Sequence, residues 1–176
     1  VLAEDDGMSA QLAATAVGDY HDLETVRAFV KDVDVITFDH EHVPQSILRA
    51  LVADGVAVHP GPDALQFAQD KLLMRRRLAE LGIPIPEWAE VRDEAELQAF
   101  IDDNGGVAVL KTPRGGYDGK GVRVVASAAE ADEAFASDRE LLAEELVDFR
   151  RELSAQVARR PSGEFVAYPV VESRQR

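Results

Sequence analysis

The sequence of 176 residues contains no cysteine and is short of basic residues. Without cysteine the chain has no disulfide, no thiolate metal site and no cysteine nucleophile. It has 19 lysines and arginines against 33 aspartates and glutamates, which argues against a broad nucleic-acid surface but leaves room for a local group of cations. No apolar run approaches the roughly 20 residues of a membrane span. The first residues also lack the basic and apolar regions of a signal peptide, so we expect a cytoplasmic protein.

The remaining composition is typical of a globular protein, with 46% hydrophobic and 30% charged residues. A chain of this length can bury a core and can hold one or two small domains. It starts without methionine, and it ends on Arg174-Gln-Arg176 directly after an apolar run. We therefore expect the chain to be a piece of a longer protein.

The first part of the sequence alternates strand and helix patterns, as in a parallel α/β unit. The patterns predict helices at 22–30 and 44–53, strands at 34–38 and 56–58, and one long helix at 64–81 that has a basic end, Arg75-Arg-Arg77, and stops at Gly82. Ile83-Pro-Ile-Pro86 is stiff and extended. We therefore place a linker at 83–86, between a domain of residues 1–82 and a second domain of residues 87–176.

The second domain mixes strands and helices in an order typical of an α+β unit. Strands are expected at 88–91, 107–110, 122–125, 141–145, 152–158 and 165–171, and helices at 93–101 and 127–135. The fold class we expect is therefore α/β with a partial parallel sheet, followed by a smaller α+β unit.

Residues 111–121, Lys-Thr-Pro-Arg-Gly-Gly-Tyr-Asp-Gly-Lys-Gly, lie between two of the apolar runs. Glycine leaves no Cβ between the backbone and a ligand, so a glycine loop with a lysine near each end suits a hairpin flap over phosphates. The pattern is neither the helix-opening phosphate loop nor a dinucleotide motif, because β-branched residues follow it. A plain surface hairpin is the alternative. The side chains of Arg114, Tyr117, Asp118 and Lys120 among the glycines favour a ligand loop.

Other charged residues could bind a ligand, although each has a plainer explanation. Lys111, at the end of a strand beside the loop, can meet phosphate oxygens or can point into solvent. By composition alone, Lys71 is better explained as part of a solvated helix face. The acidic stretch from Glu144 to Glu152 could bind an adenine edge and ribose hydroxyls, or it could be acidic surface.

The segment His40-Glu41-His42 follows a predicted strand, where open α/β sheets bind their ligands. A His-x-His pair can hold a metal, but the spacing places no third ligand. A polar substrate contact or a capped loop is favoured instead.

Taken in order, these segments resemble a known family. The matching stretches are 34–44 (Asp-Val-Ile-Thr-Phe-Asp-His-Glu-His-Val-Pro), 68–71 (Ala-Gln-Asp-Lys), Lys111 with 114–121 (Arg-Gly-Gly-Tyr-Asp-Gly-Lys-Gly), 144–145 (Glu-Glu), 151–154 (Arg-Glu-Leu-Ser) and 168–172 (Tyr-Pro-Val-Val-Glu). The chain is similar along essentially its whole length to the carboxyaminoimidazole ribonucleotide synthases, which are ATP-grasp ligases of de novo purine biosynthesis. The resemblance implies a partial pre-ATP-grasp domain at 1–82 and an ATP-grasp lid subdomain at 87–176.

This resemblance implies an activity, a cofactor and partners. It implies ATP-dependent carboxylation of 5-aminoimidazole ribonucleotide with bicarbonate to N5-carboxyaminoimidazole ribonucleotide, with Mg²⁺ beside the ATP. The Mg²⁺ ligands are expected in a C-terminal half of the grasp that this chain lacks, so the chain alone is expected to be inactive. A homodimer is expected for the full-length protein, without a nucleic-acid or membrane partner. The alternatives are another ATP-grasp carboxylate–amine ligase and a non-catalytic nucleotide-binding module.

The resemblance also assigns roles to residues, and it reverses the plainer explanation of Lys71. The two lysines match phosphate contacts, residues 116–122 match the flap, 144–147 match the strand that meets adenine, and Glu152 matches a ribose contact. The full nucleotide-binding set is Lys71, Lys111, Gly116, Tyr117, Asp118, Gly119, Lys120, Gly121, Val122, Glu144, Glu145, Leu146, Val147, Glu152 and Glu172. The set implied for the ribonucleotide is Tyr117, Asp118, Lys120 and Glu41. No catalytic residue is assigned.

Overall fold

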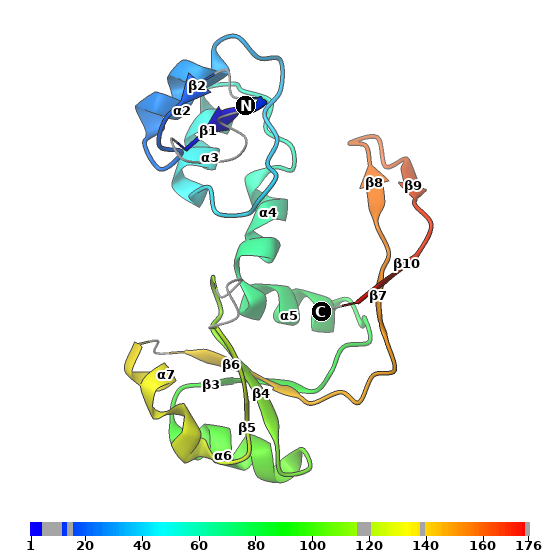
Figure 1. Ribbon diagram of the computed structural model, residues 1–176. Coiled ribbons are helices and arrows are strands. Elements are labelled where there is room, and N and C mark those ends of the chain that lie inside the picture. Colours follow the sequence, from blue (N-terminus) through cyan, green and yellow to red (C-terminus); the bar gives the residue numbers. More distant parts are fainter. Residues whose placement is uncertain (5–11, 14–15, 116–120, 138–139, 175–176) are drawn as a thin grey trace. The chain divides into compact units, whose positions relative to one another are not determined.

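The computed structural model describes residues 1–4, 12–13, 16–115, 121–137 and 140–174. The chain forms two separate compact units, Val1–Glu145 and Leu146–Arg176. Figure 1 shows the elements of each unit in sequence colours. In the described part of the chain, no helix combines the length and the apolar character needed to cross a membrane.

The first unit begins with a small parallel α/β arrangement. Strand β1 (Leu2–Ala3) pairs in parallel with β2 (Ala16–Val17), and helices α2 (Leu23–Val30) and α3 (Gln45–Ala53) pack beside them. The apolar residues of the two helices share a buried core that includes Val26, Val30, Ile47, Leu48 and Leu51. The predicted helices and the parallel α/β class are confirmed here.

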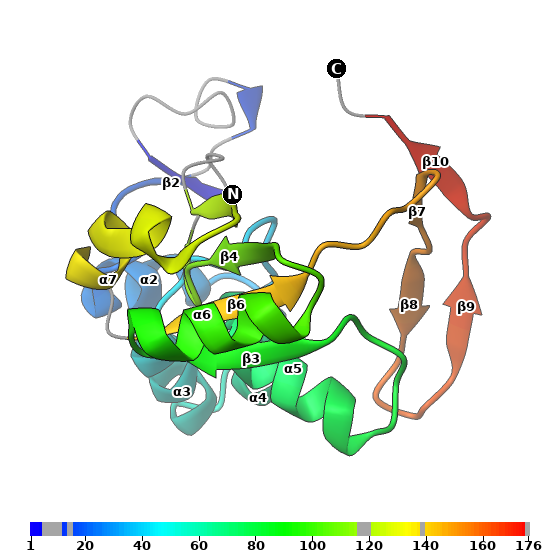
Figure 2. The ribbon, with the colours of Figure 1, turned by 90° about the horizontal axis from the view of Figure 1, so that it is seen from below.

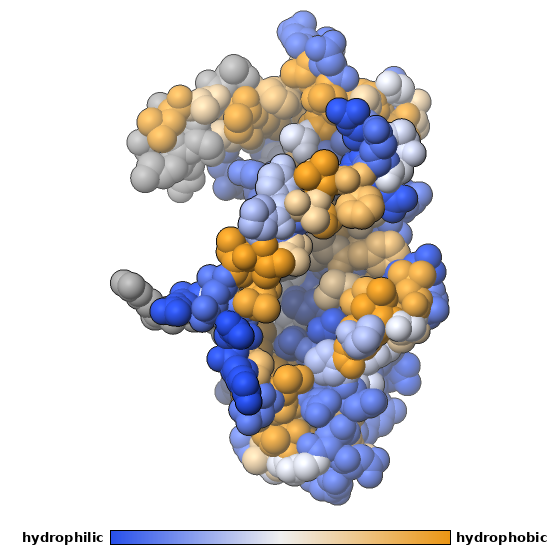
Figure 3. Space-filling model, turned by 90° about the vertical axis from the view of Figure 1, so that its right-hand side faces the viewer, coloured by the Kyte–Doolittle hydropathy of each residue, from blue (hydrophilic) through white to orange (hydrophobic). Residues whose placement is uncertain are grey.

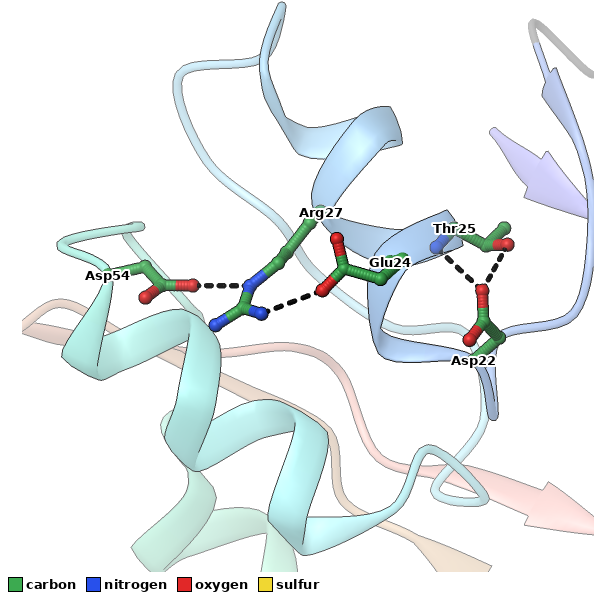
Figure 4. A network of polar contacts seen from close by, with 5 residues as sticks. All are labelled: Asp22, Glu24, Thr25, Arg27 and Asp54. Carbon is green, nitrogen blue, oxygen red and sulfur yellow. Dashed lines mark hydrogen bonds and ion pairs between the residues drawn. The ribbon is translucent and has the colours of Figure 1, made fainter.

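A polar network holds the ends of these two helices (Figure 4). Asp22 caps α2, because its carboxylate accepts a hydrogen bond from the backbone N–H of Thr25 at 2.9 Å. Arg27 donates to Glu24 on the same helix and to Asp54 at the end of α3, at 2.8 Å each. This network joins the C-terminal end of α3 to the exposed side of α2.

The predicted strands at 34–38 and 56–58 are wrong in extent. The structure has only one parallel bridge there, between Ile36 and Val58. Two backbone hydrogen bonds of 2.9 Å form it, from Ile36 to the carbonyl of Ala57 and from His59 to the carbonyl of Ile36. The residues on either side of the bridge form no further ladder with each other, so the β-branched sequence does not give a regular strand here.

The predicted long helix at 64–81 is also wrong, because it is two helices. Helix α4 (Pro62–Gln69) and helix α5 (Lys71–Glu80) run in different directions (Figure 1). Asp70 stands between them in an extended conformation, with φ −134° and ψ 109°, and its side chain accepts a hydrogen bond from the N–H of Leu73 at 3.0 Å. Aspartate competes with helix continuation by capping the next helix, and here the cap prevails.

A four-stranded sheet and the helices beside it form the rest of the first unit. Strands β3 (Trp88–Val91), β4 (Ala108–Lys111), β5 (Val122–Val125) and β6 (Leu141–Glu145) lie in the order β3-β6-β4-β5, with every neighbouring pair antiparallel. Helix α6 (Glu94–Asp103) lies across one face of this sheet (Figure 2). The predicted strands and this helix are confirmed.

Side chains of the sheet alternate between a buried apolar core and a second face, called the polar face here for its charged residues, on which Leu142 is also buried. The core contains Val91, Leu97, Phe100, Ile101, Ala108, Leu110, Val125, Leu141 and Ala143. The opposite face carries the alternate residues, among them Glu90, Lys111 and Glu144.

The helix predicted at 127–135 is a short 3₁₀ turn η1 (Ala128–Ala131) followed by α7 (Asp132–Ser137). Ser127 and Glu130 form a capping box at its start.

The second unit consists of two strand pairs. Strand β7 (Glu152–Ser154) pairs with β10 (Val171–Ser173), and β8 (Val157–Arg159) pairs with β9 (Phe165–Ala167), both antiparallel. The strands predicted at 152–158 and 165–171 are thus each divided in two, although their hairpin pairing is confirmed. All its described residues are exposed except Ser154 and Gly163, which are half-buried. Hydrophobic side chains accordingly reach the surface of the protein in several places (Figure 3).

Candidate functional site

The break at Asp70 brings the α4–α5 junction against the start of the glycine-containing loop between β4 and β5. The backbone N–H of Lys71 donates to the carbonyl of Pro113 at 2.9 Å, and its Nζ donates to the carbonyl of Gly115 at 2.8 Å. Arg114 donates through Nε to Asp70 Oδ2 at 3.0 Å. We call Pro113, Arg114 and Gly115 the loop root; all three contact the junction.

Lys111 and Glu144 meet on the polar face of the sheet. Lys111 Nζ and Arg75 Nε donate to different oxygens of the Glu144 carboxylate, and Glu144 is only 3% exposed. Burial raises the pKa of Glu144, but the hydrogen bonds and charges of Arg75 and Lys111 outweigh it, so this pKa lies below its ordinary value. Glu144 is therefore charged at neutral pH and fixes the ammonium of Lys111 at the end of β4.

The two lysines of the site influence each other. Burial lowers the pKa of Lys71, and repulsion from the nearby charge of Lys111 lowers it further. The carboxylates of Glu41, Asp70 and Glu144 act in the opposite direction but do not cancel the effect. A ligand with several negative charges that contacts both ammonium groups would relieve this repulsion.

A pocket of 440 Å³ lies next to the loop root. Its lining includes Glu41 and His42, Gln69 and Asp70, and Arg114 and Gly115. These residues come from three stretches of the sequence, so the fold unites the polar segment at 40–42 with the junction and the loop. The pocket presents both acidic and basic groups, which suits a small polar ligand.

Gln69 holds the segment of Glu41 in place. Its Nε2 donates to the carbonyls of Glu41 and Val43 at 2.7 Å each, and its Oε1 accepts from Gln45 Nε2 at 2.8 Å. The last residue of α4 therefore fixes one wall of the pocket, and the next residue, Asp70, holds the loop root.

The first unit thus brings together four of the residues singled out from the sequence: Glu41, Lys71, Lys111 and Glu144. Gly116, Tyr117, Asp118, Gly119 and Lys120 lie outside the described residues.

Gly121, Val122 and Glu145 belong to the same unit. The carbonyl of Gly121 accepts from the N–H of Thr112 at 3.0 Å and closes the base of the loop. Val122 lies opposite Lys111 in the β4–β5 register. Glu145 ends β6, where its N–H donates to the carbonyl of Glu87 at 2.9 Å.

Four further predicted residues lie in the second unit, and the structure does not gather them into a cluster. Leu146 and Val147 are exposed and precede the strands. Glu152 lies opposite Ser173, whereas Glu172 lies opposite Leu153. Successive positions of a strand point to opposite faces, so the side chains of Glu152 and Glu172 lie on opposite faces of this strand pair.

Sequence reasoning missed Asp70, Gln69 and Arg75 as parts of the site. Asp70 has a local signal in the sequence. Aspartate is common at the position just before a helix, where its carboxylate accepts a hydrogen bond from the N–H three residues later. Arg75 has none: it was assigned to a basic helix end, and its partner Glu144 is 69 positions away. Arg76 likewise pairs with Glu90 on the polar face of the sheet.

Comparison with known proteins agrees with this architecture. Residues 76–176 match the ATP-grasp domain, and residues 1–69 match the ribonucleotide synthetase preATP-grasp domain. The chain therefore belongs to the ATP-grasp family.

Individual relatives are more specific. The chain is 46% identical over 180 residues to an N5-carboxyaminoimidazole ribonucleotide synthase of Mycobacterium tuberculosis, and this similarity covers 100% of the chain but 42% of the relative. Two solved structures of the corresponding Aspergillus clavatus enzyme also match. The complex with ATP has a TM-score of 0.84 and 31% identity over 98% of this chain and 47% of that one. The complex with ADP and 5-aminoimidazole ribonucleotide has a TM-score of 0.80 and 29% identity over 98% and 46%. The chain thus spans less than half the length of these relatives.

Proposed function

We propose that the protein containing this chain is an ATP-dependent ligase that carboxylates 5-aminoimidazole ribonucleotide with bicarbonate, giving N5-carboxyaminoimidazole ribonucleotide. The relatives named above are enzymes of this kind, and two of the matched structures hold ATP, or ADP with 5-aminoimidazole ribonucleotide. The domains proposed for it are a partial pre-ATP-grasp domain at 1–82, a linker at 83–86 and a lid subdomain at 87–176. The protein is proposed to act in the cytoplasm, as a homodimer.

One observation carries this proposal. Lys71 and the loop root, which are 44 positions apart, are hydrogen-bonded to each other beside a pocket lined by Glu41 and Arg114. Cations for phosphates and a polar pocket for a second substrate are therefore adjacent, as a reaction between ATP and another small molecule requires.

In the proposed reaction an oxygen of bicarbonate attacks the γ-phosphorus of ATP, and the bond to the β–γ bridging oxygen breaks to release ADP. The amine of the ribonucleotide then attacks the carboxyl carbon, phosphate leaves, and the amine loses a proton. When the leaving phosphate departs first, carbon dioxide is the species attacked. Lys71 and Lys111 would stabilise the negative charge of the transferred phosphoryl group.

The remaining predicted contacts keep their proposed roles. Residues 116–122 would cover the phosphates, residues 144–147 would meet adenine, Glu152 the ribose and Glu172 a further part of the nucleotide. Because the side chain of Glu144 is occupied by Arg75 and Lys111, its share in adenine binding is proposed for the backbone and for the residues that follow it. Tyr117, Asp118, Lys120 and Glu41 would face the ribonucleotide.

Mg²⁺ is proposed to accompany ATP and to offset the charge of its phosphates. In the described ranges, no group of three or more His, Asp or Glu side chains is arranged to hold a metal, and both oxygens of Glu144 already accept from cations. The described carboxylates therefore do not fit a complete Mg²⁺ site. The relatives are more than twice as long as the chain, so the ligands are proposed to lie outside it, and the chain alone is proposed to be inactive.

The test uses the full-length protein that contains this chain. We expect ADP and phosphate to form only when ATP, bicarbonate and 5-aminoimidazole ribonucleotide are all present. Glu41→Gln should raise the KM for the ribonucleotide about tenfold, because it removes a charged hydrogen-bonding group, and should leave the KM for ATP within about twofold. Glu80→Gln is the control. It replaces an exposed glutamate at the end of α5 and should leave the KM for the ribonucleotide and the KM for ATP unchanged.

Two results would overturn the proposal. ATP turnover that needs a different acceptor would identify another ATP-grasp ligase, and ATP binding without any turnover would indicate a nucleotide-binding module.

A further inference from the structure

We propose that Asp70 is a positioning residue, which fixes Lys71 and the loop root relative to each other so that both are in place for the phosphates of ATP. This inference extends the proposed function, on which its kinetic readout rests. The sequence assigned no role to Asp70. A positioning role does not require Asp70 to contact a ligand.

The two oxygens of Asp70 act on two different segments. Oδ1 accepts from the N–H of Leu73 at 3.0 Å and so starts α5, whereas Oδ2 accepts from Arg114 Nε at 3.0 Å and so holds the loop root. Asp70 is 9% exposed, which restricts its side chain to this arrangement. One carboxylate therefore determines both where α5 begins and where the loop leaves the sheet.

Lys71 depends on the same arrangement. It is the first residue of α5, so the cap at Asp70 sets the direction of its side chain. Its own N–H and Nζ donate to Pro113 and Gly115, on either side of Arg114. If the Asp70–Arg114 pair were lost, the two hydrogen bonds of Lys71 would still join the junction to the loop root. The position of the Lys71 ammonium relative to the loop root would become less defined. A displacement of about 1 Å at a group that binds the reacting phosphates is enough to reduce a rate greatly.

Asp93 provides a comparison for the capping role within the same unit, at an exposed position. It starts α6 as Asp70 starts α5, in an extended conformation and with its carboxylate accepting from the N–H of Glu96 at 2.8 Å. Unlike Asp70, it has no arginine partner in the part of the chain that the structure describes. A variant at Asp93 therefore tests the capping role alone.

The experiment compares Asp70→Asn with Asp93→Asn in the full-length protein. Asparagine still caps a helix, but it removes the charge that holds Arg114. We expect Asp70→Asn to raise the KM for ATP about tenfold while its melting temperature stays close to that of Asp93→Asn. A purely structural role would lower the melting temperature of Asp70→Asn and would leave its KM for ATP unchanged, which would overturn the proposal.

A double variant tests whether Asp70 acts through Arg114. Arg114→Gln alone should raise the KM for ATP by a similar factor, and Asp70→Asn with Arg114→Gln should do so no further, because both changes break one interaction. Effects that multiply would show that the two residues act independently and would contradict the proposal.

Amide hydrogen exchange gives a readout that does not need turnover. The N–H of Lys71, which bonds to Pro113, should exchange about tenfold faster in Asp70→Asn than in wild type and Asp93→Asn. Unchanged exchange would refute the positioning role even in an active enzyme. Conversely, faster exchange in a protein that turns over no ATP would support the positioning role while the proposed function fails.

Discussion

The sheet of residues 88–145 and the strand pairs of residues 146–174 are both antiparallel, but only the sheet has an interior. The sheet is covered on one face by α6 and buries side chains such as Leu97 and Leu141 completely. In the strand pairs, by contrast, Leu153 is 60% exposed. Two-stranded pairs without a covered face are marginally stable in water, so the second unit lacks a core of its own among its described residues.

The polar side chains of the two regions also differ in how they are held in place. On the sheet, the opposite face holds Glu144 with both oxygens occupied by Arg75 and Lys111, and the position of Lys111 is therefore defined. On the strand pairs, Glu152 and Glu172 are exposed on opposite faces, and Glu172 pairs with the exposed Arg174 two residues further along the chain. A well-packed sheet thus gives charged side chains a more fixed geometry than an isolated strand pair does.

The largest expected effect compares a leucine of α6, which covers the sheet, with a leucine of β7 in the strand pairs. Leu97→Ala should lower the free energy of unfolding by about 3 to 4 kcal/mol, because Leu97 is 0% exposed and a cavity would remain. Leu153→Ala should change it by less than about 0.5 kcal/mol. Urea unfolding followed by the fluorescence of Trp88, the sole tryptophan of the chain and a residue of β3, measures both. Equal losses would mean that the strand pairs share a core with the sheet.

The second prediction concerns the buried carboxylate. Glu144→Gln should lower the free energy of unfolding by about 2 kcal/mol, because it leaves Arg75 and Lys111 partly buried without their counter-charge. Glu145→Gln, at the next and exposed position, should cost less than about 0.5 kcal/mol. The same urea titration applies, and Trp88 is well placed because it lies opposite Glu144 in the β3–β6 register. A larger loss of unfolding free energy for Glu145→Gln than for Glu144→Gln would contradict the assignment of Arg75, Lys111 and Glu144 as a buried charge cluster.

The smallest effect is the pH dependence of this cluster. The pKa of Glu144 lies below its ordinary value of 4.5 in the folded protein, so its stabilisation is fully present above that value and is lost as the pH falls through the lower, folded-state pKa. The stability difference between wild type and Glu144→Gln should therefore narrow between about pH 5 and about pH 3. Denaturation midpoints of both proteins across this range measure it. A difference that stays constant would show that the pKa of Glu144 is not lowered by folding, which would contradict the prediction.

Local patterns predicted much of the fold. The Val-rich runs on both sides of the glycine loop gave β4 and β5 with their antiparallel pairing, and Asp22 correctly marked the start of α2. These features depend on neighbours in the sequence, such as β-branched content and a capping side chain. Lys111 was also indicated locally, by its place at the end of a strand beside the glycine loop. Lys71 was indicated only by the family resemblance, because its local context favours a solvated helix face.

Two features were not predicted. The apolar spacing runs through Asp70 without interruption, so periodicity predicted one helix, although the cap on Leu73 and the contact with Arg114 break it at Asp70. The Arg75–Glu144 pair joins residues whose sequence context suits a solvated surface. Such long-range pairs depend on how helix and sheet pack, which residue spacing does not encode.

The junction of α4 and α5 has a consequence for protein engineering. Residues 70–75 lie between the two ranges that match known domains, 1–69 and 76–176, yet Asp70, Lys71 and Arg75 all contact the β4–β6 part of the chain. A chimera that joins the N-terminal domain of one family member to the grasp of another should therefore inherit this short segment from the same parent as the glycine loop. A crossover placed after residue 75 would pair an aspartate, a lysine and an arginine from one parent with partners from the other.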